Sequence, residues 1–368
     1  MCGIFAYLNY LTPKTRKEIV DILINGLKRL EYRGYDSAGN HLESFFKSKK
    51  ISSKQMWWRY HFPIFYPCFL GIGIDEHEAD LGIRLIKKKG KVKALQDEID
   101  DSATSLDLEG AHHVHCGIAH TRWATHGVPS EVNSHPHRSG EDNDFIVVHN
   151  GILTNYKDVK VFLQNKGYVF ESETDTEVIA KLIKHLHSVH PKNTFRELVE
   201  KTIQQLEGAF ACCFKSKKFP GECVGTRRGS PLLVGIKTES DLVSDSIPIQ
   251  FSPYEDPKKY QYGAPLPSPG PNRKKSTVFR VDSHNDREEI SPSSPADAVE
   301  YFFASDASAI IEHTDRVIFL EDDDVAAIQN GVLTIHRIKR DGDNNPISRE
   351  VTTLKMEIQE IMKGNYSR

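Results

Sequence analysis

The order of apolar segments constrains the fold of this chain more than any other feature of its sequence. Strand-length apolar runs come first, at Gly3–Leu8, Val114–Ala119 and Phe145–Val148. Helical periodicity then dominates residues 155–206, and strand-length runs resume after it. Strands, a block of helices and then further strands favour an α+β layered domain over a strictly alternating parallel sheet.

Capping residues and glycines locate the ends of the expected elements. Thr15 precedes an apolar helical pattern that runs to Leu30, and Gly167 follows another over Asn155–Lys166. Two segments have the spacing of a capping box and predict helix starts, Thr174-Asp-Thr-Glu177 and Thr194-Phe-Arg-Glu197. The remaining predictions are strands at Ala209–Lys215, Pro231–Ile236, Arg316–Leu320 and Val332–Ile335, and a helix over Val351–Lys363.

Changes in composition predict how the chain divides. We expect one domain over 2–39 and 72–340, interrupted by an insertion at 40–71. Residues 250–294 are rich in Pro, Ser, Lys and Asp and have few apolar residues to bury, so we predict a disordered surface insertion there. Residues 341–368 then contain a C-terminal helix and the start of a linker.

The bulk composition excludes several classes of protein. A net charge of −3 argues against a dedicated nucleic-acid binder, which carries a strong basic excess. The six cysteines have neither framework spacing nor a CxxC pair, which indicates a reducing compartment. No secretory signal opens the chain, and its most apolar stretch, Phe62–Ile74, is shorter than the roughly 20 residues that span a bilayer. We therefore expect a cytoplasmic protein with no membrane or nucleic-acid partner.

The second residue carries the strongest chemical signal. The chain opens Met1-Cys-Gly-Ile-Phe5, so removal of Met1 would leave Cys2 with a free α-amino group. An ordinary cysteine thiol has a pKa of about 8.5 and an α-amino group one of about 8, so the amine can accept the thiol proton. The resulting thiolate attacks carbonyl groups far better than the thiol does. The alternative is that Cys2 is simply a small residue in the first strand.

Four further clusters supply groups that such a nucleophile needs. Glu31-Tyr-Arg-Gly-Tyr-Asp-Ser-Ala-Gly39 has the glycines of tight backbone turns. Arg122, just after a predicted strand, suits bidentate binding of a ligand carboxylate. The Asn150 side chain and the Gly151 backbone amide, adjacent at the end of another strand, suit an oxyanion hole. Asp175 lies in the first turn of a predicted helix, where the helix dipole favours an ionised carboxylate that can hold an ammonium group.

Together these groups fit an α-amino acid with a side-chain carbonyl, and glutamine is such a molecule. Each cluster also has a simpler interpretation. Arg122 can be an ordinary surface arginine, Asn150-Gly151 a hairpin turn, and Asp175 only a helix-capping residue.

Five motifs together resemble the class II glutamine amidotransferase domain, and within it the glutamine–fructose-6-phosphate aminotransferase family. They are Met1-Cys-Gly-Ile4, Tyr32-Arg-Gly-Tyr-Asp-Ser-Ala-Gly39, Thr121-Arg-Trp-Ala-Thr-His-Gly127, His149-Asn-Gly-Ile152 and Ser172-Glu-Thr-Asp-Thr-Glu177. Three later segments agree with the resemblance, namely Arg227-Arg-Gly-Ser-Pro-Leu232, Ala304-Ser-Asp-Ala-Ser308 and Phe319-Leu-Glu-Asp-Asp-Asp-Val325. The family opens hexosamine and UDP-N-acetylglucosamine synthesis.

The resemblance implies an N-terminal-nucleophile fold, a four-layer αββα sandwich with two antiparallel sheets. It implies that Cys2 is the nucleophile, that Arg122 binds the α-carboxylate of L-glutamine and that Asp175 binds its α-ammonium group. The other residues that it implies at the site are Asn150 and Gly151 as oxyanion donors, Trp123, Thr125 and His126 on a loop that closes over glutamine, and Arg33 and Gly34 lining the site near the nucleophile. The implied reaction is thiolate attack on the carboxamide, loss of ammonia and hydrolysis of a thioester to glutamate. No cofactor is expected.

The family also has a second half that binds fructose 6-phosphate and accepts the ammonia, and this chain ends about where the linker to that half would begin. We therefore expect the glutaminase half of the enzyme, with the sugar-phosphate isomerase half as its absent partner and a homo-oligomer in the full-length enzyme. Two alternatives stay open. The chain can be an amidotransferase that passes ammonia to a separate acceptor chain, or an inactive or regulatory fragment.

Residues 40–71 depart from the family pattern. Deleting them joins Gly39 to Ile72 and restores a continuous strand. One hypothesis is a retained intron read in frame, because Gly39-Asn40 and Leu70-Gly71 can be encoded with splice-site sequences. The other is a lineage-specific loop that binds a partner through its aromatic residues. Because the insertion interrupts a core strand, we expect the chain to be less stable than its deletion variant.

Three minor motifs complete the sequence. His112-His-Val-His-Cys116 resembles a metal site, but it leads directly into a strand, and we expect no metal there. Lys87-Lys-Lys-Gly-Lys-Val-Lys93 is typical of a solvated charged face, although it could attract phosphate. Arg227-Arg-Gly-Ser230 resembles a basophilic kinase site, which predicts phosphorylation of Ser230.

Overall fold

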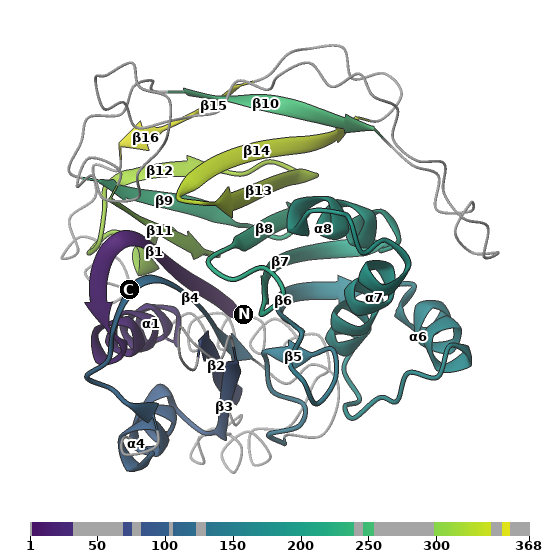
Figure 1. Ribbon diagram of the computed structural model, residues 1–368, viewed down its shortest axis with the longest axis horizontal. Coiled ribbons are helices and arrows are strands. Elements are labelled where there is room, and N and C mark those ends of the chain that lie inside the picture. Colours follow the sequence, from purple (N-terminus) through teal and green to yellow (C-terminus); the bar gives the residue numbers. More distant parts are fainter. Residues whose placement is uncertain are drawn as a thin grey trace, which may run out of the picture.

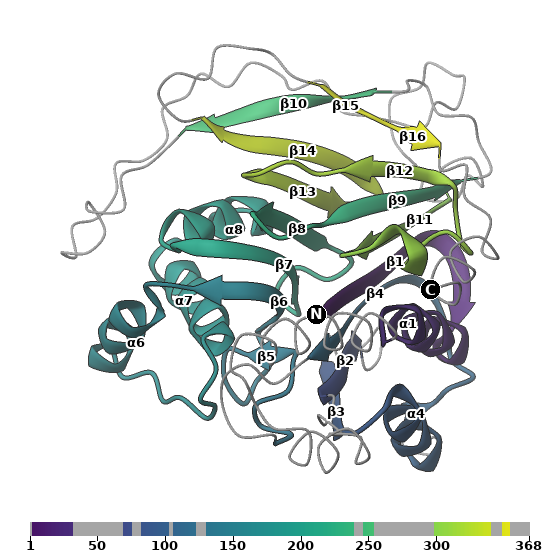
Figure 2. The same cartoon turned by 180° about the vertical axis from the view of Figure 1, so that it is seen from behind.

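The protein was analysed as a computed structural model that describes residues 2–31, 69–75, 82–102, 106–122, 130–238, 246–253, 298–339 and 348–353. Within these ranges the strands form two sheets of eight strands each. Five α-helices and one short 3-10 helix accompany them. Figures 1 and 2 show the two sheets stacked face to face between helices.

The first sheet contains the N-terminal strand near its centre, in the order β16-β12-β9-β11-β1-β4-β2-β3. Its strands are β1 (Gly3–Thr15), β2 (Phe69–Asp75), β3 (Ile83–Lys89), β4 (Ala111–Arg122), β9 (Leu233–Thr238), β11 (Val299–Ala304), β12 (Arg316–Phe319) and β16 (Thr352–Thr353). All of their pairings within the described residues are antiparallel.

The second sheet has the order β15-β10-β14-β13-β8-β7-β6-β5. Its strands are β5 (His137–Arg138), β6 (Phe145–Leu153), β7 (Gly208–Ser216), β8 (Cys223–Arg228), β10 (Ser246–Pro253), β13 (Asp324–Gln329), β14 (Val332–Lys339) and β15 (Ser348–Glu350). Its pairings are antiparallel except that β10 pairs parallel with β14, so the expectation of two antiparallel sheets needs this one exception.

Helices cover the outer faces of both sheets (Figure 1). Helices α1 (Arg16–Glu31) and α4 (Val92–Asp101) pack on the first sheet, and α7 (Thr176–Val189) and α8 (Phe195–Gln204) pack on the second. Helix α6 (Tyr156–Asn165) lies against α7, and the 3-10 helix η3 (Ala307–Ala309) lies against α1. These layers confirm the predicted four-layer αββα sandwich.

Alternation along β1 explains how one strand serves two cores. Ile4, Ala6 and Leu8 are buried between the two sheets, whereas Phe5 and Tyr7 point the other way and are buried under α1. Successive side chains of a strand point to opposite faces, so a strand between two apolar layers must be apolar at every position. This explains why the opening of the chain is a continuous apolar run.

The predicted caps are confirmed at two helices and wrong at a third. The Thr15 hydroxyl accepts from the backbone N–H of Glu18, whose carboxylate accepts from the N–H of Thr15 in return. Thr194 and Glu197 form the same capping box at α8. At α7, however, the residue before the first turn is Asp175 rather than Thr174, and neither half of the predicted box forms. The hydroxyl of Thr174 instead bonds to His137, as described below.

Several strands differ from the prediction in extent. Short runs around β8, β11 and β13 were not predicted, because each is bounded by charged residues and carries little periodic signal. Strand β2 begins at Phe69, inside the segment expected to be an insertion, and β10 overlaps the start of 250–294. Thr352 and Thr353, expected to be helical, form β16, while 354–368 and most of both expected insertions lie outside the described residues.

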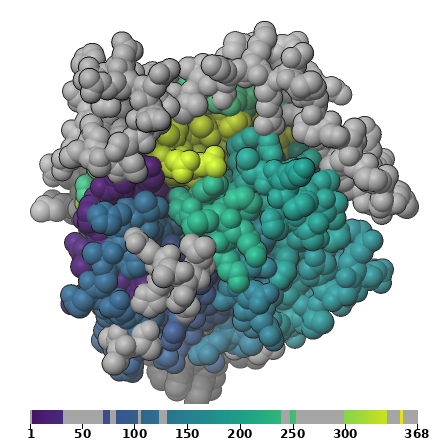
Figure 3. All heavy atoms as spheres, in the orientation of Figure 1, coloured from purple at the N-terminus to yellow at the C-terminus, as the bar shows by residue number. Residues whose placement is uncertain are grey.

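The N-terminal and middle parts of the chain meet along one face. In the space-filling view the N-terminal part of the chain, purple to blue, abuts the teal and green middle part (Figure 3). In the ribbon view the start of β1 lies where β4 of the first sheet approaches β6 of the second (Figure 1). The start of the chain is therefore placed at a junction between the sheets, where both can contribute side chains.

Candidate active site

Cys2 lies at this junction, half-buried and directly before β1. Gly3 pairs with Thr121 in the β1–β4 register, so Cys2 lies opposite the end of β4, where Arg122 stands. From the second sheet, the Asn150 side-chain amide donates to the Cys2 backbone carbonyl at 3.1 Å. The predicted nucleophile thus lies beside two of the residues predicted to serve it.

The start of β1 is held tightly on both sides of the chain. A side chain on Gly3 would place its Cβ 2.7 Å from the Leu30 Cβ and 2.8 Å from the Thr121 hydroxyl, so only glycine fits. The backbone N–H of Ile4 donates to the Ser305 hydroxyl at 3.1 Å, and the Ser305 N–H donates back to the Ile4 carbonyl at 3.1 Å. These contacts fix the backbone that presents Cys2.

Asn150 and Gly151 lie within β6, not in a hairpin turn. They pair with Ala211 and Phe210 of β7, so the hairpin interpretation is wrong. Gly151 has a φ of +130°, and a Cβ there would lie 2.0 Å from the Ala209 carbonyl oxygen. Only glycine tolerates both the backbone conformation and this contact. The pair is therefore part of a strand with a fixed backbone, and the Asn150 side chain on it faces Cys2.

Arg122 is 5% exposed, so the interpretation as an ordinary surface arginine is wrong. Its guanidinium donates to the backbone carbonyl of Asn133. Burial lowers the pKa of Arg122, and the nearby Cys2 and Asp175 oppose that shift. Arg122, Cys2 and Asp175 are therefore near enough to interact electrostatically, and the carboxylate and ammonium clamps stay predictions.

Asp175 does more than begin a helix. It precedes α7, yet its side chain makes no capping bond to that helix. Its Oδ2 instead accepts from the backbone N–H of Leu153 at 3.0 Å, three residues after Asn150. This bond ties the predicted ammonium-binding carboxylate to the end of β6, the strand that carries the predicted oxyanion donors.

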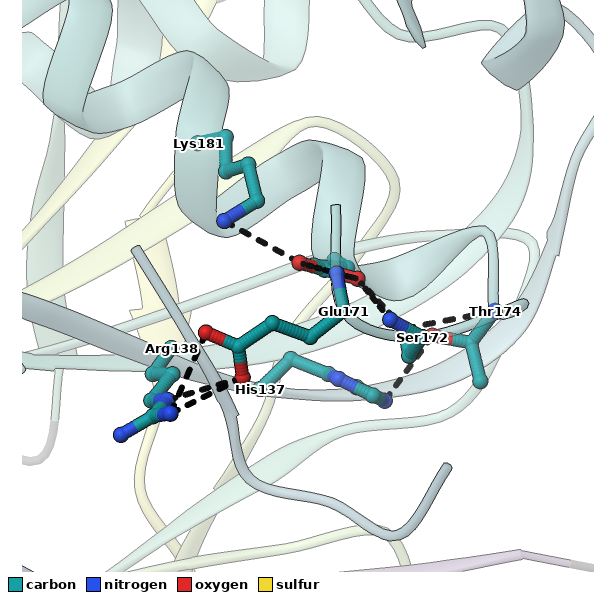
Figure 4. A network of polar contacts seen from close by, with 7 residues as sticks. His137, Arg138, Glu171, Ser172, Thr174 and Lys181 are labelled. Carbon is teal, nitrogen blue, oxygen red and sulfur yellow. Dashed lines mark hydrogen bonds and ion pairs between the residues drawn. The ribbon is translucent and has the colours of Figure 1, made fainter. Parts of the chain in front are cut away.

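A buried polar network holds the segment that carries Asp175 (Figure 4). The Glu177 carboxylate accepts from the N–H groups of Glu171 and Ser172 and from the Ser172 hydroxyl, and it pairs with Lys181 at 3.1 Å. These bonds keep the pKa of Glu177 low even though burial alone would raise it. The Glu177 carboxylate thus organises the loop before α7, in place of the predicted capping box.

The same network continues to β5. Thr174 and His137 share a hydrogen bond of 2.9 Å, and the Glu171 carboxylate receives two N–H groups of Arg138 at 3.0 and 3.1 Å (Figure 4). Bidentate pairs of this kind restrict both side chains in direction as well as distance. The loop that presents Asp175 is therefore anchored at both of its sides.

Four histidines form a buried layer behind Asn150. Their ring centroids are 4.0 Å apart for His120 and His135, 4.9 Å for His135 and His137, and 6.4 Å for His135 and His149. Burial lowers the pKa of His120 to about 3 and also lowers that of the other three. All four are therefore neutral near pH 7 and act through hydrogen bonds and packing.

Five predicted site residues lie outside the described residues, namely Arg33, Gly34, Trp123, Thr125 and His126. Conversely, sequence reasoning missed His120, His135, Ser305 and the role of Glu177. His120, Ser305 and Glu177 each lie inside or next to a motif that was singled out for another residue, whereas His135 has no such signal. A side chain that supports a neighbour has no residue-type signature of its own.

The minor motifs have ordinary surroundings. His115 is fully buried, its pKa is lowered to about 3 by burial, and its Nε2 accepts from the N–H of Asp75. In the part of the chain that the structure describes, no group of three or more metal-ligating side chains is arranged around one point. In the lysine-rich run, Lys88 pairs with Glu98 and Lys93 with Asp97, as on a solvated face.

Ser230 follows Gly229, whose φ is +77°, at the start of the connection between β8 and β9. The preceding arginines both form ion pairs, because Arg227 pairs with Asp322 at 2.8 Å and Arg228 with Asp323 at 2.7 Å.

Within the described residues, no helix has the length and apolar character needed to cross a membrane.

Comparisons with known proteins relate this chain to glutamine amidotransferases. Residues 120–224 match the glutamine amidotransferase domain family. The chain is 53% identical over 371 residues to glutamine–fructose-6-phosphate aminotransferase [isomerizing] 1 of Rattus norvegicus, covering all of this chain and 47% of the relative. It is 41% identical to the Saccharomyces cerevisiae enzyme, again with full coverage of this chain and 49% of the relative. The chain thus spans about half the length of the curated relatives it matches.

Among solved structures, the Bacillus subtilis glutamine phosphoribosylpyrophosphate amidotransferase matches with a TM-score of 0.53, over 92% of this chain and 50% of that one. At 17% identity the match supports the fold alone. Together with the buried arrangement around Cys2, the sequence matches identify the relationship. The chain belongs to the glutamine amidotransferase domain family, in the form carried by the glutamine–fructose-6-phosphate aminotransferases.

Proposed function

We propose that this chain hydrolyses glutamine to glutamate and ammonia, with Cys2 as the nucleophile. The observation that carries the proposal is the position of the Cys2 backbone, which receives the Asn150 amide at 3.1 Å opposite the buried end of β4. Arg122 interacts electrostatically with both Cys2 and Asp175. The guanidinium suits the α-carboxylate of an amino acid, and the Asp175 carboxylate suits its α-ammonium group.

The proposed reaction begins after removal of Met1. The free α-amino group of Cys2 takes the thiol proton, and the thiolate attacks the side-chain carbonyl of glutamine. The oxyanion formed receives the Asn150 amide and the Gly151 backbone N–H. The C–N bond then breaks, ammonia leaves with the proton returned by the amine, and water hydrolyses the thioester to glutamate and the free thiol.

The experiment is glutamate release from glutamine by the purified protein and its Cys2→Ala variant. We expect release by the parent and a loss of at least about 10³-fold in the variant, as for other removed nucleophiles. Cys213→Ala, a fully buried cysteine of β7 outside the site, is the matched control. Activity that survives in Cys2→Ala would exclude Cys2 as the nucleophile, and an inactive parent would favour a regulatory fragment.

We further propose that the ammonia goes to a sugar phosphate held by a second half of the protein, and that the product enters hexosamine synthesis. Support comes from relatives named glutamine–fructose-6-phosphate aminotransferase, of which this chain covers about half. The described cysteines are all free, which supports a reducing, cytoplasmic location. Addition of a separately purified isomerase half with fructose 6-phosphate should yield glucosamine 6-phosphate; ammonia released only to solution would count against the partnership.

We also propose that Ser230 is phosphorylated by a basophilic kinase. A phosphate two residues beyond Arg228 would compete with Asp322 and Asp323 for the two arginines that they now hold. Mass spectrometry after kinase treatment should find the phosphate on Ser230, and Ser230→Ala should remove it. Phosphate found elsewhere, or not at all, would contradict the proposal.

A further inference from the structure

The Asn150 side chain lies between two partners that determine its orientation. On one side is the Cys2 backbone carbonyl at 3.1 Å, which can only accept a hydrogen bond. The amide must therefore turn its NH₂ toward Cys2. Its oxygen then faces the opposite way, toward the Nε2 of His120 at 2.9 Å. Because an amide oxygen can only accept, Nε2 must carry the proton of that bond.

We propose that His120 is a positioning residue for the reaction, a role that rests on the proposed glutaminase function. As the neutral tautomer with its proton on Nε2, it holds the Asn150 amide with the NH₂ group toward the reacting thiol. One NH₂ hydrogen is used by the Cys2 carbonyl, and the second is available to the oxyanion that forms on the substrate.

The orientation matters because the two ends of an amide have opposite polarity. The NH₂ end stabilises a developing negative charge, whereas the oxygen end would repel it. An asparagine without His120 would lose one of the two bonds that fix this orientation and would keep only the bond to the Cys2 carbonyl. His120 thus acts on the transition state through Asn150 and need not touch glutamine.

The surroundings of His120 suit this role. Its side chain is fully buried, and burial keeps the ring neutral, since it lowers the pKa to about 3. The ring packs at 4.0 Å on His135, whose Nδ1 accepts from the backbone N–H of His149 at 3.4 Å. His149 directly precedes Asn150 in β6, so the histidine layer holds both the side chain and the backbone of the oxyanion-binding strand.

A double-mutant cycle on glutamate release tests the inference. His120→Leu fills most of the ring volume without a donor, and we expect it to lower kcat by about 100-fold, the range for loss of one oxyanion donor, with KM for glutamine changed less than about 3-fold. Because His120 acts through Asn150, the double variant with Asn150→Ala should be no slower than Asn150→Ala alone. Additive losses would overturn the inference.

His120→Gln provides the conservative comparison. Its amide nitrogen reaches about as far as Nε2 and keeps a donor, so kcat should recover to within about 10-fold of the parent. A glutamine variant as slow as His120→Leu would count against a hydrogen-bonding role. Thermal unfolding of each variant separates loss of activity from loss of fold.

A second measurement does not depend on turnover. Nitrogen-15 spectra of the histidine side chains of the full chain, with His120→Gln to assign the signal, report which ring nitrogen carries the proton. We expect His120 to have its proton on Nε2 and to stay neutral from pH 8 to pH 5. A proton on Nδ1, or a charged ring in this range, would refute the inference even if the parent proves active. An inactive parent with the expected tautomer would instead refute the proposed function and leave the geometry of the amide confirmed.

Discussion

At the scale of single residues, the site depends on positions where no other side chain fits or carries the required charge. Gly151 is the clearest example, since its φ is +130° and an added Cβ would lie 2.0 Å from the Ala209 carbonyl oxygen. Asp175 is a second, because the bond to Leu153 needs only an oxygen whereas binding of an ammonium needs a negative charge. These two residues permit separate tests of shape and charge.

We predict that Gly151→Ala destabilises the fold by at least about 3 kcal/mol, because backbone strain and a clash with the peptide group act together. Chemical denaturation measures the loss. Gly167→Ala is the matched control: Gly167 also has a positive φ, of +88°, but nothing lies within 4 Å of the added Cβ. The control should lose only about 1 kcal/mol, from the backbone alone. Equal losses at both positions would contradict the role of the close contact.

We predict that Asp175→Asn raises KM for glutamine by about 10- to 100-fold while kcat falls much less. The amide oxygen can still accept from the Leu153 N–H, so the loop should keep its geometry, but the negative charge proposed to bind the substrate ammonium is lost. Steady-state kinetics against glutamine concentration separate the two parameters. A pure kcat effect with unchanged KM would assign Asp175 to a different step.

At the scale of elements, β2 raises the question of what residues 40–71 do. Its first described residues, Phe69 to Gly71, pair with Arg122 to His120 of β4, and a Cβ on Gly71 would lie 2.1 Å from the His135 carbonyl oxygen. Deletion of 40–71 would put Gly39 directly before Ile72, in the place of Gly71. The chain thus contains two segments ending in glycine that can complete the same strand, which supports the proposal that 40–71 is an insertion.

We predict that the deletion variant keeps β2, with Gly39 in the place of Gly71, and melts at a higher temperature than the full chain. The reason is that a shorter connection between α1 and β2 closes at a lower entropic cost. In the deletion variant Gly39→Ala should lower the melting temperature sharply, whereas the same substitution in the full chain should matter less. There Gly71→Ala should be the damaging change. Equal melting temperatures for parent and deletion would contradict the expected cost of the insertion. Whether 40–71 is a retained intron is decided by the sequence of the mature transcript.

At the scale of the whole molecule, buried titratable groups make the fold sensitive to acid. The pKa values of His115 and His120 are lowered to about 3 by burial, and those of His135, His137 and His149 are also lowered. A histidine with a depressed folded pKa stabilises the fold above its unfolded pKa of about 6.5, and this contribution is lost as the pH falls toward the folded value. Burial raises the pKa of Asp324 to about 6, which acts in the opposite direction: its contribution is present below about pH 4 and is lost as the pH rises through 6.

We predict that the histidines dominate and that stability falls steeply between pH 6.5 and pH 4. At pH 5 each histidine with a folded pKa near 3 has lost about 2 kcal/mol, a large part of the roughly 5–15 kcal/mol that holds a typical domain. Melting temperature against pH measures the effect. His120→Gln should shift the acid transition to lower pH, whereas His113→Gln, at an exposed position, should not. A flat profile across this range would contradict the neutral histidine layer.

The sequence predicts the reactive residues of the candidate site better than the residues that hold them in position. The proposed nucleophile, arginine, oxyanion pair and aspartate could all be predicted from the sequence, because each lies in a motif together with residue types that suit the reaction. The Glu177 network and the His120–Asn150 bond were not, because they join residues that are distant in sequence or whose types also occur in ordinary cores. The predicted box at Thr174 failed for the same reason, since His137, a distant residue, binds the threonine hydroxyl.

The sequence by itself determined the layered α+β class, the two caps at Thr15 and Thr194 and the list of reactive groups around Cys2. These depend on local periodicity, on bonds within one turn and on the chemistry of single side chains, all of which can be recognised in the linear sequence. Only the tertiary structure decided that Arg122 is buried, that Asn150-Gly151 lies within a strand and that the Asn150 amide has a fixed direction. Those properties arise where β1, β4 and β6 from two different sheets meet, and no pattern along one segment encodes what another segment brings beside it.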